Sequence, residues 1–187
     1  MSVKIIGGKF KGFPLKVPDS ARPTLSRHRQ SLFDMLESQS PGGNGFFKEK
    51  ILMDCFAGSG AFGFEAISRG AGYVYFVDSD PGAISAIHYN NKKMKTDEFC
   101  SIIRSDVRLL KYNQTDWAPV DLVFLDPPYG KVSVSKTLEH LFEIRRISEK
   151  TIIITEESAG KSEFIEDKHS VLVSKTIGNT IFKIILY

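Results

Sequence analysis

The sequence predicts an α/β domain with a mostly parallel sheet that ends in an antiparallel hairpin. From residue 50 onward, short apolar stretches alternate with stretches of helical period, which is typical of parallel strands joined by right-handed helical crossovers. The last extended run, residues 171–187, is broken at Gly178-Asn179, a pair that favours a tight turn between antiparallel strands. With 187 residues and 42% hydrophobic content, the chain can bury one core, so we expect a single domain.

The first 45 residues are predicted to form a small extension to this domain. Residues 3–6 and 13–17 indicate two short strands joined through glycines. A helix is expected to begin at Pro23-Thr24 and to end before the Ser-, Pro- and Gly-rich stretch at 39–45. Its predicted apolar face consists of Leu25, Leu32, Phe33 and Leu36.

Residues 50–187 are predicted to form the core of the domain. Apolar runs bounded by turn residues indicate its strands, and longer amphipathic runs indicate its helices. The expected strands are 51–54, 73–77, 99–104, 120–125, 151–155 and the two halves of 171–187. The expected helices are 61–69, 81–94 and 133–147.

Positive charge is concentrated at the start of the chain. Residues 1–30 contain seven lysines and arginines and a single acid, Asp19, so this segment carries +6 and the remaining residues carry −3. The asymmetry favours a polyanionic partner for the N-terminal segment, with a solvated basic surface as the alternative. The residues expected to hold nucleic-acid phosphates are Lys9, Lys11, Arg22, Arg27 and Arg29.

The composition argues against membrane, secreted and metal-dependent proteins. No apolar run approaches the roughly 20 residues of a membrane helix, and the N-terminus lacks the apolar segment of a secretion signal, so we expect a cytoplasmic protein. Cys55 and Cys100 are each flanked by apolar residues, which predicts buried free thiols. The histidines are scattered without zinc-site spacing, and we expect no structural metal.

A glycine-rich segment, residues 54–63, lies between the first core strand and the first core helix. Its glycines let the backbone turn tightly and let a ligand approach without a Cβ in the way. They form a GxGxxG pattern, so NAD and S-adenosylmethionine are both candidate ligands. Asp54 favours S-adenosylmethionine, because a carboxylate at this position repels a pyrophosphate and attracts sulfonium and ammonium groups.

Acidic residues follow the next two strands. Asp78 comes about 20 residues after the first glycine of the pattern, where a carboxylate can accept both ribose hydroxyls of an adenosine, and Asp80 is an alternative for this role. Asp106 can meet an adenine amino group or cap a helix. In this Rossmann-like site the expected cofactor contacts are Asp54, Phe56, Ala57, Gly58, Ser59, Gly60, Asp78, Ser79, Asp106 and Asp126.

The motif Asp126-Pro127-Pro128-Tyr129 follows the predicted strand 120–125, at the sheet edge where open α/β folds bind ligands. It suits methylation of an exocyclic amine, whose lone pair is delocalised into the ring of the base. Hydrogen bonds from this amine to the Asp126 carboxylate and the Pro127 carbonyl orient the lone pair and offset the developing charge. The prolines hold that carbonyl rigidly, and Tyr129 is expected to stack on a base pulled out of its helix. A simple strand terminator is the alternative.

Nearly the whole chain resembles the RsmD-type small-subunit ribosomal RNA (guanine-N2)-methyltransferases of bacteria. The segments that carry the resemblance are Ile5 to Gly12, Arg22-Pro23-Thr24, Arg27, Arg29, Leu32-Phe33, Asp54 to Gly60, and Asp126-Pro127-Pro128-Tyr129. It implies a class I S-adenosylmethionine-dependent methyltransferase that modifies the exocyclic N2 of a guanine in 16S ribosomal RNA. It also implies that Gly58 to Gly60 and Asp78 bind the cofactor, and that Asp126 to Tyr129 hold the guanine.

Three positions depart from the family pattern. Asp78 stands where a glutamate is usual, Leu25-Ser26 where an acid or threonine often precedes the first arginine of the helix, and Gln30 where the family has a glutamate. Asp78 keeps a carboxylate at the cofactor site, whereas we expect no charged role for Gln30. Arg22 and Thr24 have two candidate roles, contact with RNA and contact with the carboxylate of the cofactor.

Three other functions fit parts of the pattern. An adenine-N6 methyltransferase of DNA or RNA can use the same Asp126 motif, but a DNA enzyme generally needs a recognition domain for which the chain has little room. An NAD-binding oxidoreductase needs a His or Tyr proton donor that is not evident, and a non-catalytic RNA-binding module has no need of Asp126. For the methyltransferase we expect a monomer that acts on 16S ribosomal RNA, free or within an assembling 30S particle.

Overall fold

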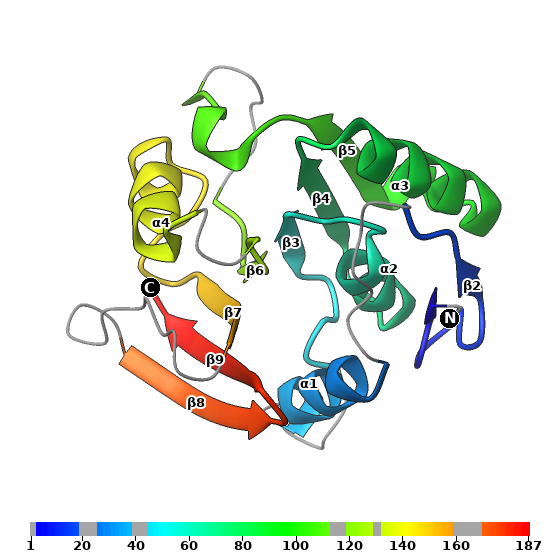
Figure 1. Ribbon diagram of the computed structural model, residues 1–187, viewed down its shortest axis with the longest axis horizontal. Coiled ribbons are helices and arrows are strands. Elements are labelled where there is room, and N and C mark those ends of the chain that lie inside the picture. Colours follow the sequence, from blue (N-terminus) through cyan, green and yellow to red (C-terminus); the bar gives the residue numbers. More distant parts are fainter. Residues whose placement is uncertain (1–2, 19–25, 39–44, 113–118, 129–131, 159–169) are drawn as a thin grey trace.

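The computed structural model describes residues 3–18, 26–38, 45–112, 119–128, 132–158 and 170–187. Over these residues a seven-stranded sheet crosses the molecule and a separate two-stranded sheet lies beside it (Figure 1). The strands of the large sheet, in spatial order, are β5 (Cys100–Arg104), β4 (Tyr73–Asp78), β3 (Ile51–Cys55), β6 (Leu122–Leu125), β7 (Ile152–Ser158), β9 (Thr180–Leu186) and β8 (Ser170–Ile177).

The order of the strands reverses at the centre of the sheet. Strands β3 to β7 run parallel, and β9 runs antiparallel to both β7 and β8. The chain proceeds outward from β3 through β4 to β5 and then returns to add β6 on the other side of β3. The carboxyl ends of β3 and β6 therefore meet where the strand order reverses, which is where such sheets bind ligands. A mostly parallel sheet with an antiparallel C-terminal hairpin confirms the predicted fold class.

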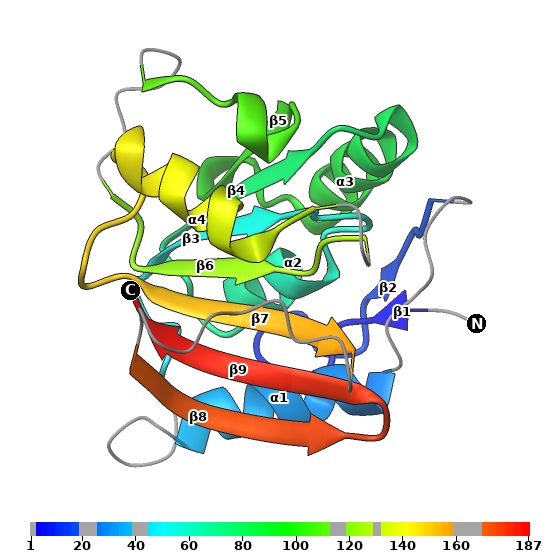
Figure 2. The ribbon, with the colours of Figure 1, turned by 60° about the vertical axis from the view of Figure 1, so that its left-hand side comes forward.

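Helices cover both faces of the sheet (Figures 1 and 2). Helices α1 (Ser26–Ser38), α2 (Ala61–Ser68) and α3 (Pro81–Met94) pack on one face, and α4 (Val134–Glu143) packs on the other. Phe62 of α2 stacks on Phe124 of β6 with ring centroids 4.0 Å apart, which joins the first helix of the core to the centre of the sheet. Two short 3-10 helices, η1 (Asp97–Phe99) and η2 (Val107–Leu109), were not predicted, because three residues carry no detectable period.

Helix α4 ends earlier than the predicted range of 133–147. Arg145 has a φ of 57°, a left-handed conformation that a helix does not continue through. Arg146 is buried, at 1% exposure, and its guanidinium donates a hydrogen bond of 2.9 Å to the carbonyl of Tyr112. The chain therefore turns at Arg145 to bring Arg146 against the segment that follows η2.

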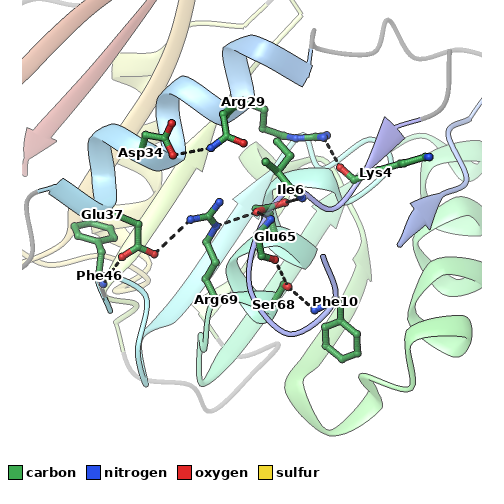
Figure 3. A network of polar contacts seen from close by, with 12 residues as sticks. Lys4, Ile6, Phe10, Arg29, Asp34, Glu37, Phe46, Glu65, Ser68 and Arg69 are labelled. Carbon is green, nitrogen blue, oxygen red and sulfur yellow. Dashed lines mark hydrogen bonds and ion pairs between the residues drawn. The ribbon is translucent and has the colours of Figure 1, made fainter. Parts of the chain in front are cut away.

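The strands of the N-terminal hairpin are shorter than predicted, and the loop between them is hydrogen-bonded to helix α2 (Figure 3). Its strands are β1 (Val3–Lys4) and β2 (Pro14–Leu15). Beyond β1, the N–H groups of Ile6 and Gly7 donate to the two carboxylate oxygens of Glu65, at 2.6 and 2.7 Å. The Ser68 hydroxyl accepts from the N–H of Phe10 at 2.9 Å and donates to the carbonyl of Gly7.

The same network reaches α1 (Figure 3). Arg69 donates from Nε to Glu65 at 2.9 Å and lies 3.7 Å from a carboxylate oxygen of Glu37 on α1. Its guanidinium also lies over the ring of Phe33, 4.9 Å from the centroid. The hairpin, α1 and α2 are therefore joined by buried or half-buried polar contacts. The predicted start of the first helix, Pro23-Thr24, lies outside the described residues.

Cys55 and Cys100 are buried free thiols, as predicted. In the part of the chain that the structure describes, no cluster of His, Cys, Asp or Glu is suited to a metal ion. Nor is any described helix both long and apolar enough to cross a membrane.

Candidate active site

The glycine segment after β3 is a tight loop fastened to the end of β4. Phe56, Gly58 and Gly60 all have positive φ, at 63°, 56° and 74°. The N–H of Ala57 donates to the carbonyl of Val77 at 3.1 Å, and the N–H of Gly58 donates to the Asp78 carboxylate at 2.8 Å. The loop therefore has one fixed shape set by the neighbouring strand.

The glycines of this loop serve different purposes. A Cβ at Gly60 would lie 2.7 Å from the ring of Phe64, and one at Gly63 would lie 2.3 Å from the ring of Phe76, so both are required for packing. A Cβ at Gly58 would meet nothing closer than the carbonyl of Phe56, 4.0 Å away. Gly58 thus leaves open space at the sheet edge, as expected where a ligand approaches the backbone.

Asp78, the last residue of β4, holds the loop through its carboxylate. Its Oδ2 accepts from Gly58, and its Oδ1 accepts from the N–H of Asp80 at 2.9 Å. Each carboxylate oxygen retains a further lone pair for a ligand hydroxyl. Asp80 is the N-cap of α3, where its side chain accepts from the N–H of Gly82 at 3.0 Å. Ser79 lies between these two acids.

Asp54, at the carboxyl half of β3, is 1% exposed and accepts a 3.0 Å hydrogen bond from the N–H of Gly63. Burial raises its pKa well above the usual range, and the negative charges of Asp78 and Asp126 raise it further. A cation bound among these three carboxyl groups would favour their ionised forms. The electrostatics of this edge therefore suit a positively charged ligand.

Asp126, which directly follows β6, is a neighbour of Glu156 within β7. Leu125 pairs with Thr155 in the parallel ladder, so Asp126 and Glu156 follow at the next position. Burial raises the pKa of Asp126 to about 6. Burial and the charge of Asp126 together raise the pKa of Glu156, which is 7% exposed, to about 8.

Glu156 was not predicted as a site residue. A signal was present, because Glu156-Glu157 directly follows the predicted strand 151–155, whose centre is the apolar run Ile152 to Ile154. Of the rest of the motif, Pro127 is buried, Pro128 is exposed, and Tyr129 lies outside the described residues. Phe124, two residues before Asp126 in the chain, stacks on Phe62.

Asp106 behaves as a helix cap. Its side chain accepts from the N–H of Arg108 at 2.9 Å and forms an ion pair with the guanidinium of the same residue. Hydrogen bonds from Arg108 lower the pKa of Asp106. The capping alternative is therefore confirmed, and contact of Asp106 with an adenine stays a prediction.

The predicted phosphate-binding residues do not all reach the surface. Lys9 and Lys11 are exposed, and the ammonium of Lys9 lies 5.3 Å from the ring centroid of Phe10. Arg22 and the side chain of Arg27 lie outside the described residues.

The prediction for Arg29 is wrong. Its side chain is 5% exposed, and Nη2 donates to the carbonyl of Lys4 at 2.7 Å. Burial lowers its pKa, while the charge of Glu65 opposes that effect. Arg29 therefore fastens β1 to α1 and does not present its charge to a surface ligand.

The strand order, the glycine loop after β3, the acid after β4 and the acid-proline-proline motif after β6 together define a Rossmann-like methyltransferase. The chain belongs to the family described as conserved hypothetical protein 95, whose model matches residues 3–186. It is 32% identical over 157 residues to a putative ribosomal RNA methyltransferase of Bacillus subtilis. That match covers 82% of each of the two chains.

Two further relatives extend the similarity to nearly the full length. The chain is 30% identical over 186 residues to the ribosomal RNA small subunit methyltransferase D of Haemophilus influenzae, covering 97% of this chain and 92% of that one. A solved structure of a putative methyltransferase from Escherichia coli matches with a TM-score of 0.80 and 25% identity, covering 99% of this chain and 97% of that chain. The resemblance stated from the sequence motifs is confirmed.

Proposed function

We propose that this protein transfers a methyl group from S-adenosylmethionine to the exocyclic N2 of a guanine in small-subunit (16S) ribosomal RNA. The observation that carries the proposal is the pairing of β3 with β6. Because Cys55 pairs with Leu125, the glycine loop and Asp126 leave adjacent strands at the same edge of the sheet. A donor on the loop and an amine at Asp126 would therefore be neighbours.

The residues present fit the methyl donor. The space above Gly58 admits a ligand against the backbone, and Asp78 has lone pairs free for ribose hydroxyls. A sulfonium or ammonium bound beside Asp54 would favour its ionised form and would be stabilised by the resulting charge. When bound, S-adenosylmethionine supplies a methyl group on a sulfonium, and the sulfur keeps the electron pair of the broken bond.

Asp126 and Pro127 would hold the acceptor. Two hydrogen bonds from the amine, one to the Asp126 carboxylate and one to the Pro127 carbonyl, would leave the nitrogen lone pair directed at the loop. As the nitrogen attacks, positive charge develops on it, and the Asp126 carboxylate stabilises that charge and can take the released proton. Tyr129 remains the predicted stacking residue for the base.

Glu156 would help to keep Asp126 ionised. Two neighbouring carboxyl groups, Glu156 buried and Asp126 half-buried, disfavour a double negative charge, so one of them binds a proton first. Burial raises the pKa of both groups, and the charge of Asp126 raises that of Glu156 further, so Glu156 is proposed to hold the proton near neutral pH. Asp126 is then the anion that meets the amine.

The choice of ribosomal RNA as substrate draws on the names of the relatives and on the basic hairpin. The Haemophilus influenzae relative is named for the small ribosomal subunit, and the Bacillus subtilis relative for ribosomal RNA. Lys9 and Lys11 are exposed on the hairpin and would contact phosphates together with Arg22 and Arg27.

The proposal is tested by methylating 16S ribosomal RNA with the purified full-length chain and labelled S-adenosylmethionine. Free RNA and 30S particles are compared as substrates, and the product nucleoside is identified by mass spectrometry. We expect N2-methylguanosine at one position. A methylated adenosine would overturn the choice of base, and transfer into DNA but not RNA would overturn the choice of polymer.

A further inference from the structure

Helix α3 and the N-terminal hairpin share a surface that carries lysines and no acid. Residues 3–18 contain four lysines, all exposed, and no Asp or Glu. Helix α3 lies beside β2 in both ribbon views, and its 14 residues also include lysines but no acid (Figures 1 and 2). Surface helices of soluble proteins usually mix both signs of charge, so a single sign across two adjoining elements suggests an anionic ligand.

Tyr89 is the centre of this surface. Its ring is 47% exposed, although it is a large aromatic side chain. The ammonium of Lys16, from the hairpin, lies 5.2 Å from the ring centroid, and that of Lys93, one turn further along α3, lies 5.8 Å from it. Two like charges that converge on one ring repel each other, and a phosphate between or beside them would relieve that repulsion.

The position of Lys16 is fixed by the residue next to Tyr89. Asn90 is fully buried, and its side-chain amide accepts from the N–H of Lys16 at 2.8 Å and donates to the carbonyl of the same residue at 2.9 Å. The same amide nitrogen donates to the carbonyl of Ser59 in the glycine loop at 3.0 Å. One buried side chain therefore joins the basic surface to the loop at the candidate active site.

We propose that the surface formed by Lys16, Tyr89 and Lys93 binds a segment of the RNA substrate outside the reacting base. The two ammonium groups would contact phosphates, and the exposed ring would stack on an unpaired base. This inference rests on the proposed function, because it takes RNA as the substrate. It adds a second contact region, on α3, to the hairpin lysines predicted from the sequence.

The test compares two double variants of the full-length chain. Lys16→Ala/Lys93→Ala removes both charges at Tyr89. The matched control is Lys48→Ala/Lys150→Ala. It removes two exposed lysines that precede β3 and β7, at the amino ends of the parallel strands. Binding to 16S ribosomal RNA is measured over a range of salt concentrations, together with KM and kcat for methylation and affinity for S-adenosylhomocysteine.

We expect the Lys16/Lys93 variant to bind RNA roughly tenfold more weakly near 0.1 M salt, with a salt slope lower by about 1.5. KM for RNA should rise, while kcat and affinity for S-adenosylhomocysteine stay within about twofold of wild type. Tyr89→Ala should weaken binding at least about fivefold, and Tyr89→Phe should restore it, since the phenyl ring still stacks.

Equal effects of the two double variants, or a Tyr89→Ala variant that binds like wild type, would overturn the inference. If the wild-type protein methylates RNA normally in that case, only the inference that the α3 surface binds RNA is wrong. If the wild-type protein binds S-adenosylhomocysteine but neither binds nor methylates RNA, the proposed function fails as well.

Discussion

The two halves of the candidate site differ in the hydrogen bonds that the chain makes to their carboxyl groups. On the side of β3 and β4, Asp54 and Asp78 accept hydrogen bonds from backbone N–H groups of the glycine segment and its surroundings. On the side of β6 and β7, Asp126 and Glu156 have no hydrogen bond to another described residue, and burial raises the pKa of both. The proposed cofactor side is thus organised by the chain itself, whereas the proposed base side keeps acceptors that a bound amine could use.

Removal of Asp126 should impair methyl transfer on the β6 and β7 side of the site and leave cofactor binding on the β3 and β4 side unchanged. We expect Asp126→Ala to lower the rate of methyl transfer by about 10²–10³-fold or more, since it removes the group that stabilises the developing charge. Single-turnover methylation measures this rate. Calorimetric titration with S-adenosylhomocysteine should give an affinity close to that of wild type, and a large loss of that affinity would contradict the division into two halves.

Substitutions of two glycines should separate ligand space from packing on the cofactor side. Gly60→Ala places a Cβ 2.7 Å from Phe64 at a positive φ, and we expect it to lower the free energy of unfolding by about 3 kcal/mol. Gly58→Ala meets no such clash, so it should cost only about 1 kcal/mol while weakening S-adenosylhomocysteine binding at least about tenfold. Urea denaturation and calorimetry measure both. Unchanged binding by Gly58→Ala would mean that the space above Gly58 is not the cofactor site.

The pH dependence of stability should reveal the buried proton on Glu156. Its folded pKa lies above the unfolded value, so its contribution to stability is present at low pH and is lost as the pH rises toward about 8. Glu156→Gln removes this loss. We expect the variant to gain about 3 kcal/mol over wild type between pH 5 and pH 8, measured by urea denaturation.

Glu149→Gln, the same substitution at an exposed position, is the matched control for this measurement. A Glu156→Gln variant whose difference from wild type is the same at both pH values would show that Glu156 is already ionised in the folded protein.

The smallest effect is expected at Asp80, which the sequence analysis gives as the alternative to Asp78 for the ribose contact. Asp80 caps α3, so Asp80→Ala should lower the free energy of unfolding by about 1 kcal/mol. Affinity for S-adenosylhomocysteine should change less than about twofold if Asp78 holds the ribose. A tenfold loss of affinity would instead assign the ribose to Asp80.

The fold could be predicted from the sequence because it depends on local patterns. The parallel strands and the helices between them follow from hydrophobic period, and Gly178-Asn179 marks the final turn. The glycine loop and the Asp126 motif were also found, because each is contiguous in the chain.

Relations between distant residues could not be predicted in this way. The relation of Glu156 to Asp126 depends on the register of two strands. The burial of Arg29 depends on a carbonyl at Lys4, which the period of helix α1 does not reveal. The role of Asn90 depends on contacts with Lys16 and Ser59, from two other parts of the chain.

The attachment of the hairpin to α2 has a consequence for how a target is chosen. Gly60 of the glycine loop is the N-cap of helix α2. Ser68, the last residue of that helix, binds the hairpin at Phe10. Eight helical residues span about 12 Å, and the contacts of Glu65 and Ser68 prevent the hairpin from swinging independently. If the hairpin binds the RNA strand as proposed, the reacting nucleotide would lie at a fixed distance from that contact. The protein would then select its target more by distance and shape than by the identity of the neighbouring bases.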